Sequence, residues 1–182
     1  MGRRTVATLL GFALALFAPT TGEAQQQPLG PDLWSALEAR NVGPAGMSGR
    51  VTSIAVDLSD RNRIFVGAAA GGVWRSENGG VTWSPVFDDQ PVQSIGDVVV
   101  SRANPDLVWA GTGEGNPRQS VSIGRGVFKS MDGGETWTHV GLEGTERIAR
   151  MVAHPTNPDI LYVGAMGPLW NDGGERGVYK TT

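Results

Sequence analysis

Short runs of β-branched and aromatic residues recur along the chain, and Gly, Pro, Asn and Asp separate them. Runs of this length between turn residues predict β-strands, and no stretch after residue 40 has the period of a long helix. The runs come in ordered pairs, a first and a second strand in each unit. The first strands are expected at 51–56, 95–100 and 148–153, and the second at 64–67, 107–111 and 160–164. The pattern therefore predicts an all-β fold.

A longer motif follows each second strand. Residues 72–83 align with 126–137 at a constant offset, since 130 − 76 = 54 and 137 − 83 = 54. A third copy begins at 177–181. Four strands in a unit of about 40–55 residues, with a Gly and Trp signature, are typical of a β-propeller blade. We expect a β-propeller fragment of about two and a half four-stranded blades with these hairpins.

The residue types of the motif explain the hairpin. Two glycines permit a tight turn, and an Asn or Asp side chain can accept backbone N–H bonds across it. The Trp at the end of each copy is expected to pack between neighbouring sheets, where loss to Ala costs about 3–5 kcal/mol. Asn-Pro-Asp at 104–106 and 157–159 predicts turns closed by side chains. The structural positions of the two copies are Ser76, Asn78, Gly80, Thr82, Trp83, Ser130, Asp132, Gly134, Thr136 and Trp137.

The first 24 residues predict a signal peptide. Arg3 and Arg4 precede an uncharged apolar run at 5–18, and small residues allow cleavage after Ala24. As a helix this run reaches about 21 Å, short of the ~30 Å core of a bilayer. A buried N-terminal helix is the alternative. We expect a secreted or periplasmic protein with a signal peptide at 1–24, a lead-in at 25–40 and a partial propeller at 41–182, truncated at its C-terminus.

Composition narrows the choice of partner. The chain has a net charge of −3, and removal of residues 1–24 leaves 13 basic and 17 acidic residues. There is no basic run and no cysteine, which argues against nucleic acid, membrane insertion after cleavage, and a Cys-bearing metal site. His139 and His154 are isolated, so no metal is expected. Gly111-Thr112-Gly113-Glu114-Gly115 lacks dinucleotide spacing, so no cofactor is expected either.

The two hairpin copies match the Asp-box (BNR) motif Ser-x-Asp-x-Gly-x-Thr-Trp, with Asn78 in place of Asp in the first. From about Arg40 onward the chain resembles the sortilin-like, glycosyl-hydrolase-like group of exported bacterial Asp-box proteins. The segments 40–44, 87–97, 111–118 and 141–148 carry this resemblance. It implies a longer protein, in which the remainder of the propeller is a partner of this part. Sortilin-like propellers bind ligands, and related Asp-box propellers include xyloglucan hydrolases, sialidases and a photosystem assembly factor.

In a propeller, ligand-binding loops lie at the strand ends opposite the Asp-box hairpins. Here these loops, which we call the loop face, are expected at 88–93, 112–125, 141–146 and 166–176. They carry acidic residues and an aromatic residue that could stack on a sugar, with Arg118 and Arg147 nearby. A polypeptide or polysaccharide is the expected ligand. The candidate ligand-binding residues are Asp89, Glu114, Asn116, Arg118, Glu143, Arg147 and Trp170.

Asp88 is the candidate catalytic residue. The segment 83–88 is similar to the one that carries the general-base aspartate of xyloglucan hydrolases. An inverting glycosidase needs a second carboxyl about 6.5–9.5 Å away. In that family it comes from a second propeller, which this sequence does not contain. The favoured hypothesis is a non-catalytic recognition propeller, and a glycoside hydrolase is the alternative.

Asp97 and Arg150 occupy equivalent positions on the expected innermost strands of adjacent blades, and Ser53 holds the same position in the first blade. A structural ion pair and a ligand contact are both consistent with this placement, and the ion pair is favoured because buried charges need partners.

Overall fold

The computed structural model describes residues 50–117 and 119–181, which belong to one compact unit, Asn41–Thr182. The expected signal peptide at 1–24, its cleavage near Ala24, the lead-in at 25–40 and Arg118 lie outside the described residues.

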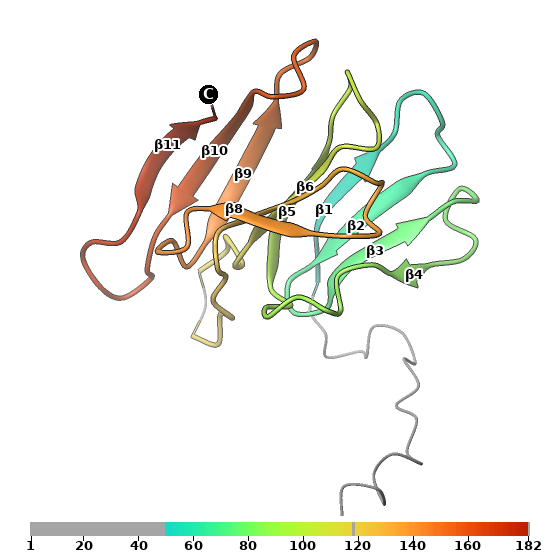
Figure 1. Ribbon diagram of the computed structural model, residues 1–182. Helices are drawn as coiled ribbons and strands as arrows, with labels where there is room; N and C mark the ends of the chain where they lie inside the picture. The colour runs from blue at the N-terminus through green and yellow to red at the C-terminus, as the bar shows by residue number, and fades with distance from the viewer. Residues whose placement is uncertain (1–49, 118, 182) are drawn as a thin grey trace, which may run out of the picture. The chain divides into compact units, whose positions relative to one another are not determined.

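Eleven strands form three antiparallel sheets, and the described residues contain no helix (Figure 1). We call the sheets blade one, blade two and blade three. Blade one has β1 (Val51–Val56), β2 (Ile64–Ala68), β3 (Gly72–Ser76) and β4 (Ser84–Pro85). Blade two has β5 (Ile95–Val100), β6 (Val108–Thr112), β7 (Val127–Ser130) and β8 (Thr138–Gly141). Blade three has β9 (Ile148–Ala153), β10 (Leu161–Met166) and β11 (Arg176–Lys180). The all-β expectation is confirmed.

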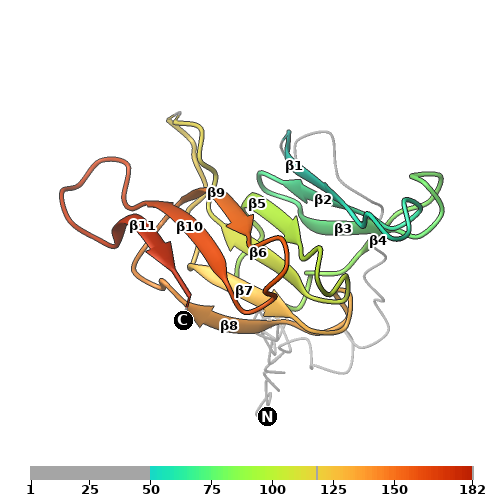
Figure 2. The ribbon, with the colours of Figure 1, turned by 90° about the horizontal axis from the view of Figure 1, so that it is seen from above.

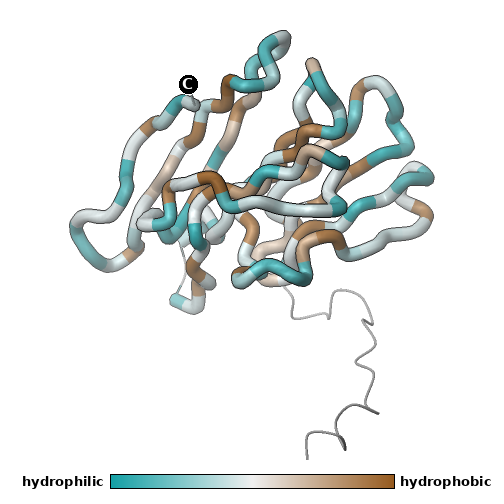
Figure 3. The backbone as a smooth tube through the Cα atoms, viewed as in Figure 1, coloured by the Kyte–Doolittle hydropathy of each residue, from teal (hydrophilic) through white to brown (hydrophobic). Residues whose placement is uncertain are grey.

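The first strand of each blade contacts the first strand of the next, so that β1, β5 and β9 lie side by side (Figure 2). Hydrophobic residues concentrate in the strands, whereas the loops are mostly hydrophilic (Figure 3). One apolar cluster, which includes Phe65, Phe87 and Phe128, fills the space between blades one and two. A second, which includes Trp109 and Ile148, lies between blades two and three. Each core is therefore shared by two neighbouring sheets.

Glycines in the second strands allow this close packing. A Cβ added at Gly67 would lie 2.6 Å from Cγ2 of Ile95, and one added at Gly111 would lie 2.7 Å from Cγ2 of Ile148. The two contacts are equivalent, because each isoleucine begins the first strand of the following blade. The missing side chain leaves room for the isoleucine of the next sheet.

Asp97 joins all three first strands. Its Oδ1 accepts a hydrogen bond from Ser53 Oγ at 2.6 Å, and its Oδ2 accepts one from the backbone N–H of Met151 at 2.6 Å. Arg150 Nε lies 3.9 Å from the same Oδ2. The Asp97 side chain is buried, so the structure supports the structural interpretation of this residue over a ligand contact.

The two repeat hairpins, residues 76–83 and 130–137, have the same internal bonds. In the first, Gly80 N–H donates to Ser76 Oγ at 2.8 Å and Thr82 N–H donates to Asn78 Oδ1 at 2.9 Å. The matching distances in the second are 2.7 and 2.9 Å, between Gly134 and Ser130 and between Thr136 and Asp132. Asn78 can stand where the second hairpin has Asp132, because its amide oxygen accepts the same backbone hydrogen bond.

The two hairpin tryptophans differ. Trp137 packs edge-on against Phe87 of blade one at 5.1 Å and donates from Nε1 to Val86 O at 2.6 Å. Trp83 is 38% exposed and donates within its own hairpin, to Gly80 O at 3.0 Å. The expectation that both pack between sheets is confirmed for Trp137 and wrong for Trp83. Trp137 packs on the sheet that precedes its own, and among the described residues no sheet precedes blade one.

Candidate functional site

Three loops of the loop face surround a cavity of about 480 Å³. It is lined by Pro91 and Val92 after blade one, by residues 123–125 of the insert in blade two, and by Glu143, Gly144 and Glu146 after blade two. Two acidic residues and Arg125 therefore line one space. The mixture of charged and apolar lining suits a polar ligand with apolar faces, such as a sugar.

Hydrogen bonds between the loops fix this cavity. Gly124 N–H donates to Glu146 O at 2.7 Å, and Ser94 Oγ donates to Ser122 O at 2.9 Å. Gly144 N–H donates to the Glu175 carboxylate at 2.8 Å, which joins the loop at 141–146 to the insert of blade three. The loops are thus bonded to one another before any ligand arrives.

Two of the candidate ligand-binding residues are buried. Glu114 forms an ion pair with Arg50, although 64 positions separate them. Arg147 donates from Nε to Gly167 O at 3.0 Å and from Nη2 to Pro168 O at 3.1 Å. Both side chains hold loop backbone or a neighbouring strand in place, so they shape the loop face from below its surface.

Asn116 and Trp170 are exposed. With its amide oxygen turned toward Arg50, Asn116 accepts a bond from Arg50 Nη2 at 3.0 Å. Trp170 is 77% exposed, in the insert of blade three. Arg176 orders this insert by donating to Asn171 O at 2.9 Å and to Gly173 O at 3.1 Å. A free indole face on an ordered loop is well placed to stack on a planar or sugar surface.

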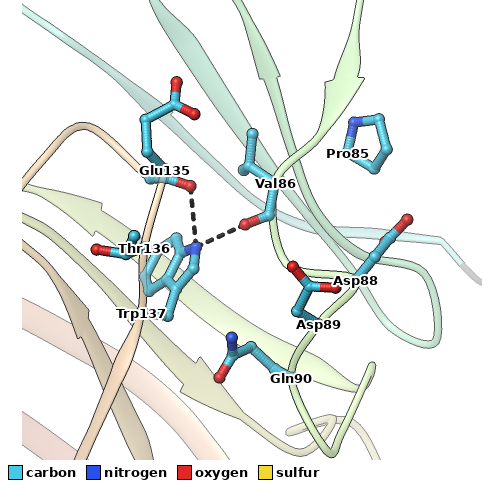
Figure 4. A pocket seen from close by; sticks show the side chains of 9 residues that line it. Pro85, Val86, Asp88, Asp89, Gln90, Glu135, Thr136 and Trp137 are labelled. Atoms are coloured by element: carbon cyan, nitrogen blue, oxygen red, sulfur yellow. Dashed lines mark hydrogen bonds between the residues drawn. The ribbon is translucent and has the colours of Figure 1, made fainter.

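Asp88 and Asp89 line a different cavity, of about 320 Å³, between blades one and two. Figure 4 shows these two side chains on one side of it and Glu135, Thr136 and Trp137 of the second repeat hairpin on the other. Gln93 closes the loop that carries the aspartates, because its Nε2 donates to the carbonyls of Phe87 and Asp88 at 3.3 Å. The structure therefore brings Asp88 together with Asp89, whereas Glu143 lines the loop-face cavity.

Two carboxylates with structural roles have lowered pKa values. Hydrogen bonds from the Thr136 side chain and backbone N–H lower the pKa of Asp132 to about 2. Burial alone would raise the pKa of Asp57, but bonds from Ser59 and Arg63 outweigh it and hold that pKa below its usual value. Arg63 also bonds Asp106 of blade two at 2.7 Å.

The described residues contain no group of three or more His, Cys, Asp or Glu side chains that could hold a metal ion.

The chain is similar to known proteins over part of its length. No protein-family model matches the chain. Over 101 residues, 48% of this chain, it is 30% identical to a xyloglucanase from Paenibacillus sp, of which the match covers 10%. The chain therefore spans about a tenth of the length of the curated relatives it matches.

Two solved structures share the sheet arrangement. A GH74 enzyme from Niastella koreensis superposes with a TM-score of 0.54 and 26% identity, over 73% of this chain and 19% of that one. YCF48 from Cyanidioschyzon merolae superposes with a TM-score of 0.50 and 18% identity, over 76% of this chain and 35% of that one. The chain folds as part of a β-propeller.

Three residues of the candidate site, Arg50, Arg125 and Glu146, could not be recognised from the sequence pattern. Arg50 precedes β1 as Arg147 precedes β9, and only the blade alignment relates them. Arg125 and Glu146 were inside the expected loops but carried no signal of their own. They become visible as cavity residues because the loops of successive blades meet at one end of the strands. Among the described residues, no helix is long and apolar enough to cross a membrane.

Proposed function

We propose that this propeller belongs to an exported Asp-box protein of the glycosyl-hydrolase-like group and that its loop face binds a polysaccharide. The observation that carries the proposal is the 30% identity to a xyloglucanase over 101 residues. Glu143 in the loop-face cavity, with Asn116 and Trp170, would contact the sugar chain. Asp-box hairpins would keep their structural role, and a signal peptide cleaved near Ala24 would deliver the protein to the periplasm or beyond.

A polysaccharide is favoured over a polypeptide ligand for a physical reason. The exposed Trp170 offers a flat apolar surface, and the acidic residues that line the loop-face cavity offer hydrogen-bond acceptors for hydroxyl groups. The recognition of an acidic peptide would instead need a surplus of cations, and the loop-face cavity has two carboxylates to one guanidinium.

Binding can be tested by affinity gel electrophoresis of the full-length protein in xyloglucan. We expect retarded migration, and at least about tenfold weaker binding for Trp170→Ala, since truncating an aromatic anchor commonly costs more than 1 kcal/mol. Trp170→Phe keeps a stacking face and should bind nearly as well. Val81→Ala, an exposed residue of the first repeat hairpin, is the matched control. Migration unaffected by xyloglucan, or by Trp170→Ala, would refute the proposal.

Hydrolysis is the second candidate, because the relatives are xyloglucanases and Asp88 lines a cavity beside Trp137. Release of reducing ends from xyloglucan should then fall about 10²-fold or more in Asp88→Asn, the usual contribution of a general base. Asp89→Asn is the neighbouring control and should retain activity. Equal rates for wild type and Asp88→Asn would remove Asp88 from the mechanism. Binding without any release of reducing ends would leave recognition as the function.

A further inference from the structure

Asn78, in the first repeat hairpin, is the one asparagine of the chain that a glycine follows. An asparagine before glycine is prone to deamidation, because glycine has no side chain to hinder the attack of its backbone nitrogen on the amide carbon. Asn104, Asn116 and Asn157 precede proline, which has no N–H and cannot react in this way. The chain therefore contains one dipeptide with the chemistry of ready deamidation.

The geometry of the turn requires the glycine of this dipeptide. Gly79 has a φ of 69°, and Gly133 has the same φ at the matching position of the second repeat hairpin. This left-handed conformation favours glycine, so the residue after position 78 has little freedom to change. Asn78 stands where the second hairpin has Asp132. An asparagine at this position of the turn is therefore always followed by the residue that makes it reactive.

In the closed hairpin, hydrogen bonds occupy both reacting groups. The Gly79 N–H donates to Asn62 O at 3.0 Å. The Asn78 side chain accepts from the Thr82 N–H at 2.9 Å and donates from Nδ2 to Thr82 Oγ1 at 2.8 Å. Ser76 Oγ also donates to Asn78 Oδ1, at 3.1 Å. Ring closure needs a deprotonated Gly79 nitrogen and a rotated amide, so the hairpin has to open locally before the reaction can begin.

The second hairpin shows that aspartate fits position 78. Asp132 accepts from the Thr136 N–H at 2.9 Å and from Thr136 Oγ1 at 2.5 Å. An aspartate in place of Asn78 keeps the backbone bond, and the Thr82 hydroxyl then donates where it now accepts. Asp132 is exposed although its hairpin packs on blade one, so solvent reaches this turn position in a packed hairpin. The water that deamidation consumes is therefore at hand.

We propose that Asn78 is a site of spontaneous deamidation and that opening of the first repeat hairpin controls the reaction. The Gly79 nitrogen loses its proton to solvent and bonds to Cγ of Asn78. The Cγ–Nδ2 bond breaks, and the amide nitrogen takes up a proton and leaves as ammonia. Water then opens the cyclic imide, either between Cγ and nitrogen to give aspartate or between the backbone carbonyl carbon and nitrogen to give isoaspartate. Aspartate rebuilds the hairpin bonds, whereas isoaspartate inserts an extra carbon into the backbone of the turn.

The reaction can be followed by peptide mass spectrometry of the 182-residue chain, kept in mildly alkaline buffer either folded or unfolded in guanidinium chloride. Trypsin yields residues 76–102, in which Asn78 is the one asparagine, and residues 103–118, in which both asparagines precede proline. We expect conversion of the first peptide in the unfolded chain, at least about tenfold slower conversion in the folded chain, and no detectable conversion of the second peptide. No conversion at Asn78 in either state, or equal rates in both, would overturn the proposal.

Ser76→Ala tests whether the first hairpin controls the rate. It removes the acceptor of the Gly80 N–H and the donor to Asn78 Oδ1, so the folded variant should deamidate about tenfold faster than wild type. Ser130→Ala makes the same change in the second hairpin and should leave the rate at Asn78 unchanged. Circular dichroism checks that both variants are folded. Equal acceleration by the two variants would contradict control by the first hairpin, because it would require opening of the whole fold.

Asn78→Asp tests the product directly and does not depend on the folding of Ser76→Ala. We expect its midpoint of urea unfolding at neutral pH to equal or exceed that of wild type, because the aspartate makes the bonds that Asp132 makes in the second hairpin. A lower midpoint for Asn78→Asp would show that the first hairpin does not accommodate the product.

Discussion

Asp97 is a buried side chain that bonds to the first strands of both neighbouring blades. It is 3% exposed and receives bonds from Ser53 of blade one and from the Met151 N–H of blade three. Asp97→Ala removes the acceptor and leaves a buried N–H unsatisfied, so we expect a loss of about 3 kcal/mol in the free energy of unfolding. Urea unfolding followed by tryptophan fluorescence measures it. Asp159→Ala, an exposed carboxylate, is the control and should change stability by less than about 0.5 kcal/mol. Equal stability of the two variants would contradict this role.

Asp132 gives the second repeat hairpin a dependence on pH that the first does not share. Its folded pKa is about 2, below the ordinary value of 3.8, because Thr136 donates to the carboxylate. The stability it contributes is therefore complete above pH 4 and is lost as the pH falls from about 4 to 2. Asp132→Asn imitates Asn78 of the first hairpin and does not titrate. The difference in urea midpoint between wild type and Asp132→Asn should shrink across this range. A difference that stays constant from pH 6 to 2 would contradict the account.

At the scale of elements, the two hairpins differ in what they contact. Trp137 bonds and packs on blade one, whereas Trp83 lies partly exposed on its own hairpin. We expect Trp137→Ala to cost about 3 kcal/mol or more in the free energy of unfolding, and Trp83→Ala clearly less. Thermal unfolding of both variants tests this order. A larger loss of stability for Trp83→Ala would contradict the contact between the second repeat hairpin and blade one.

Gly111 and Gly164 occupy the same position in the second strands of blades two and three, but their surroundings differ. A Cβ at Gly111 would overlap Ile148, but one at Gly164, the equivalent in β10, meets nothing closer than 3.4 Å. Gly111→Ala should therefore destabilise the protein by about 1–3 kcal/mol, the usual cost of overpacking a core. Gly164→Ala should be close to neutral. The midpoints of chemical unfolding measure both, and a neutral Gly111→Ala would argue that blades two and three do not pack this closely.

On the scale of the whole molecule, local patterns in the sequence predicted the architecture. The first strands lie at the predicted residues, because β-branched runs between Asn, Pro, Asp and Gly leave little choice of boundary. The side-chain turns are confirmed as well, since Asp106 and Asp159 N–H donate to Asn104 and Asn157. Contacts between blades were harder to predict. The pairing of Arg50 with Glu114 and the position of Trp83 depend on which sheet lies next to which, and no local pattern states that.

The three repeats stand side by side as equivalent blades, joined at their first strands. Nuclear Overhauser effects measured on the isotope-labelled chain test it most directly. The Val98 N–H donates to Ser53 Oγ at 3.1 Å across the boundary of blades one and two, 45 positions away in sequence. We expect a strong contact between the Val98 amide proton and the Ser53 β-protons, together with a Met151 amide protected from exchange. Contacts within β1 and β2 but none between Val98 and Ser53 would contradict it.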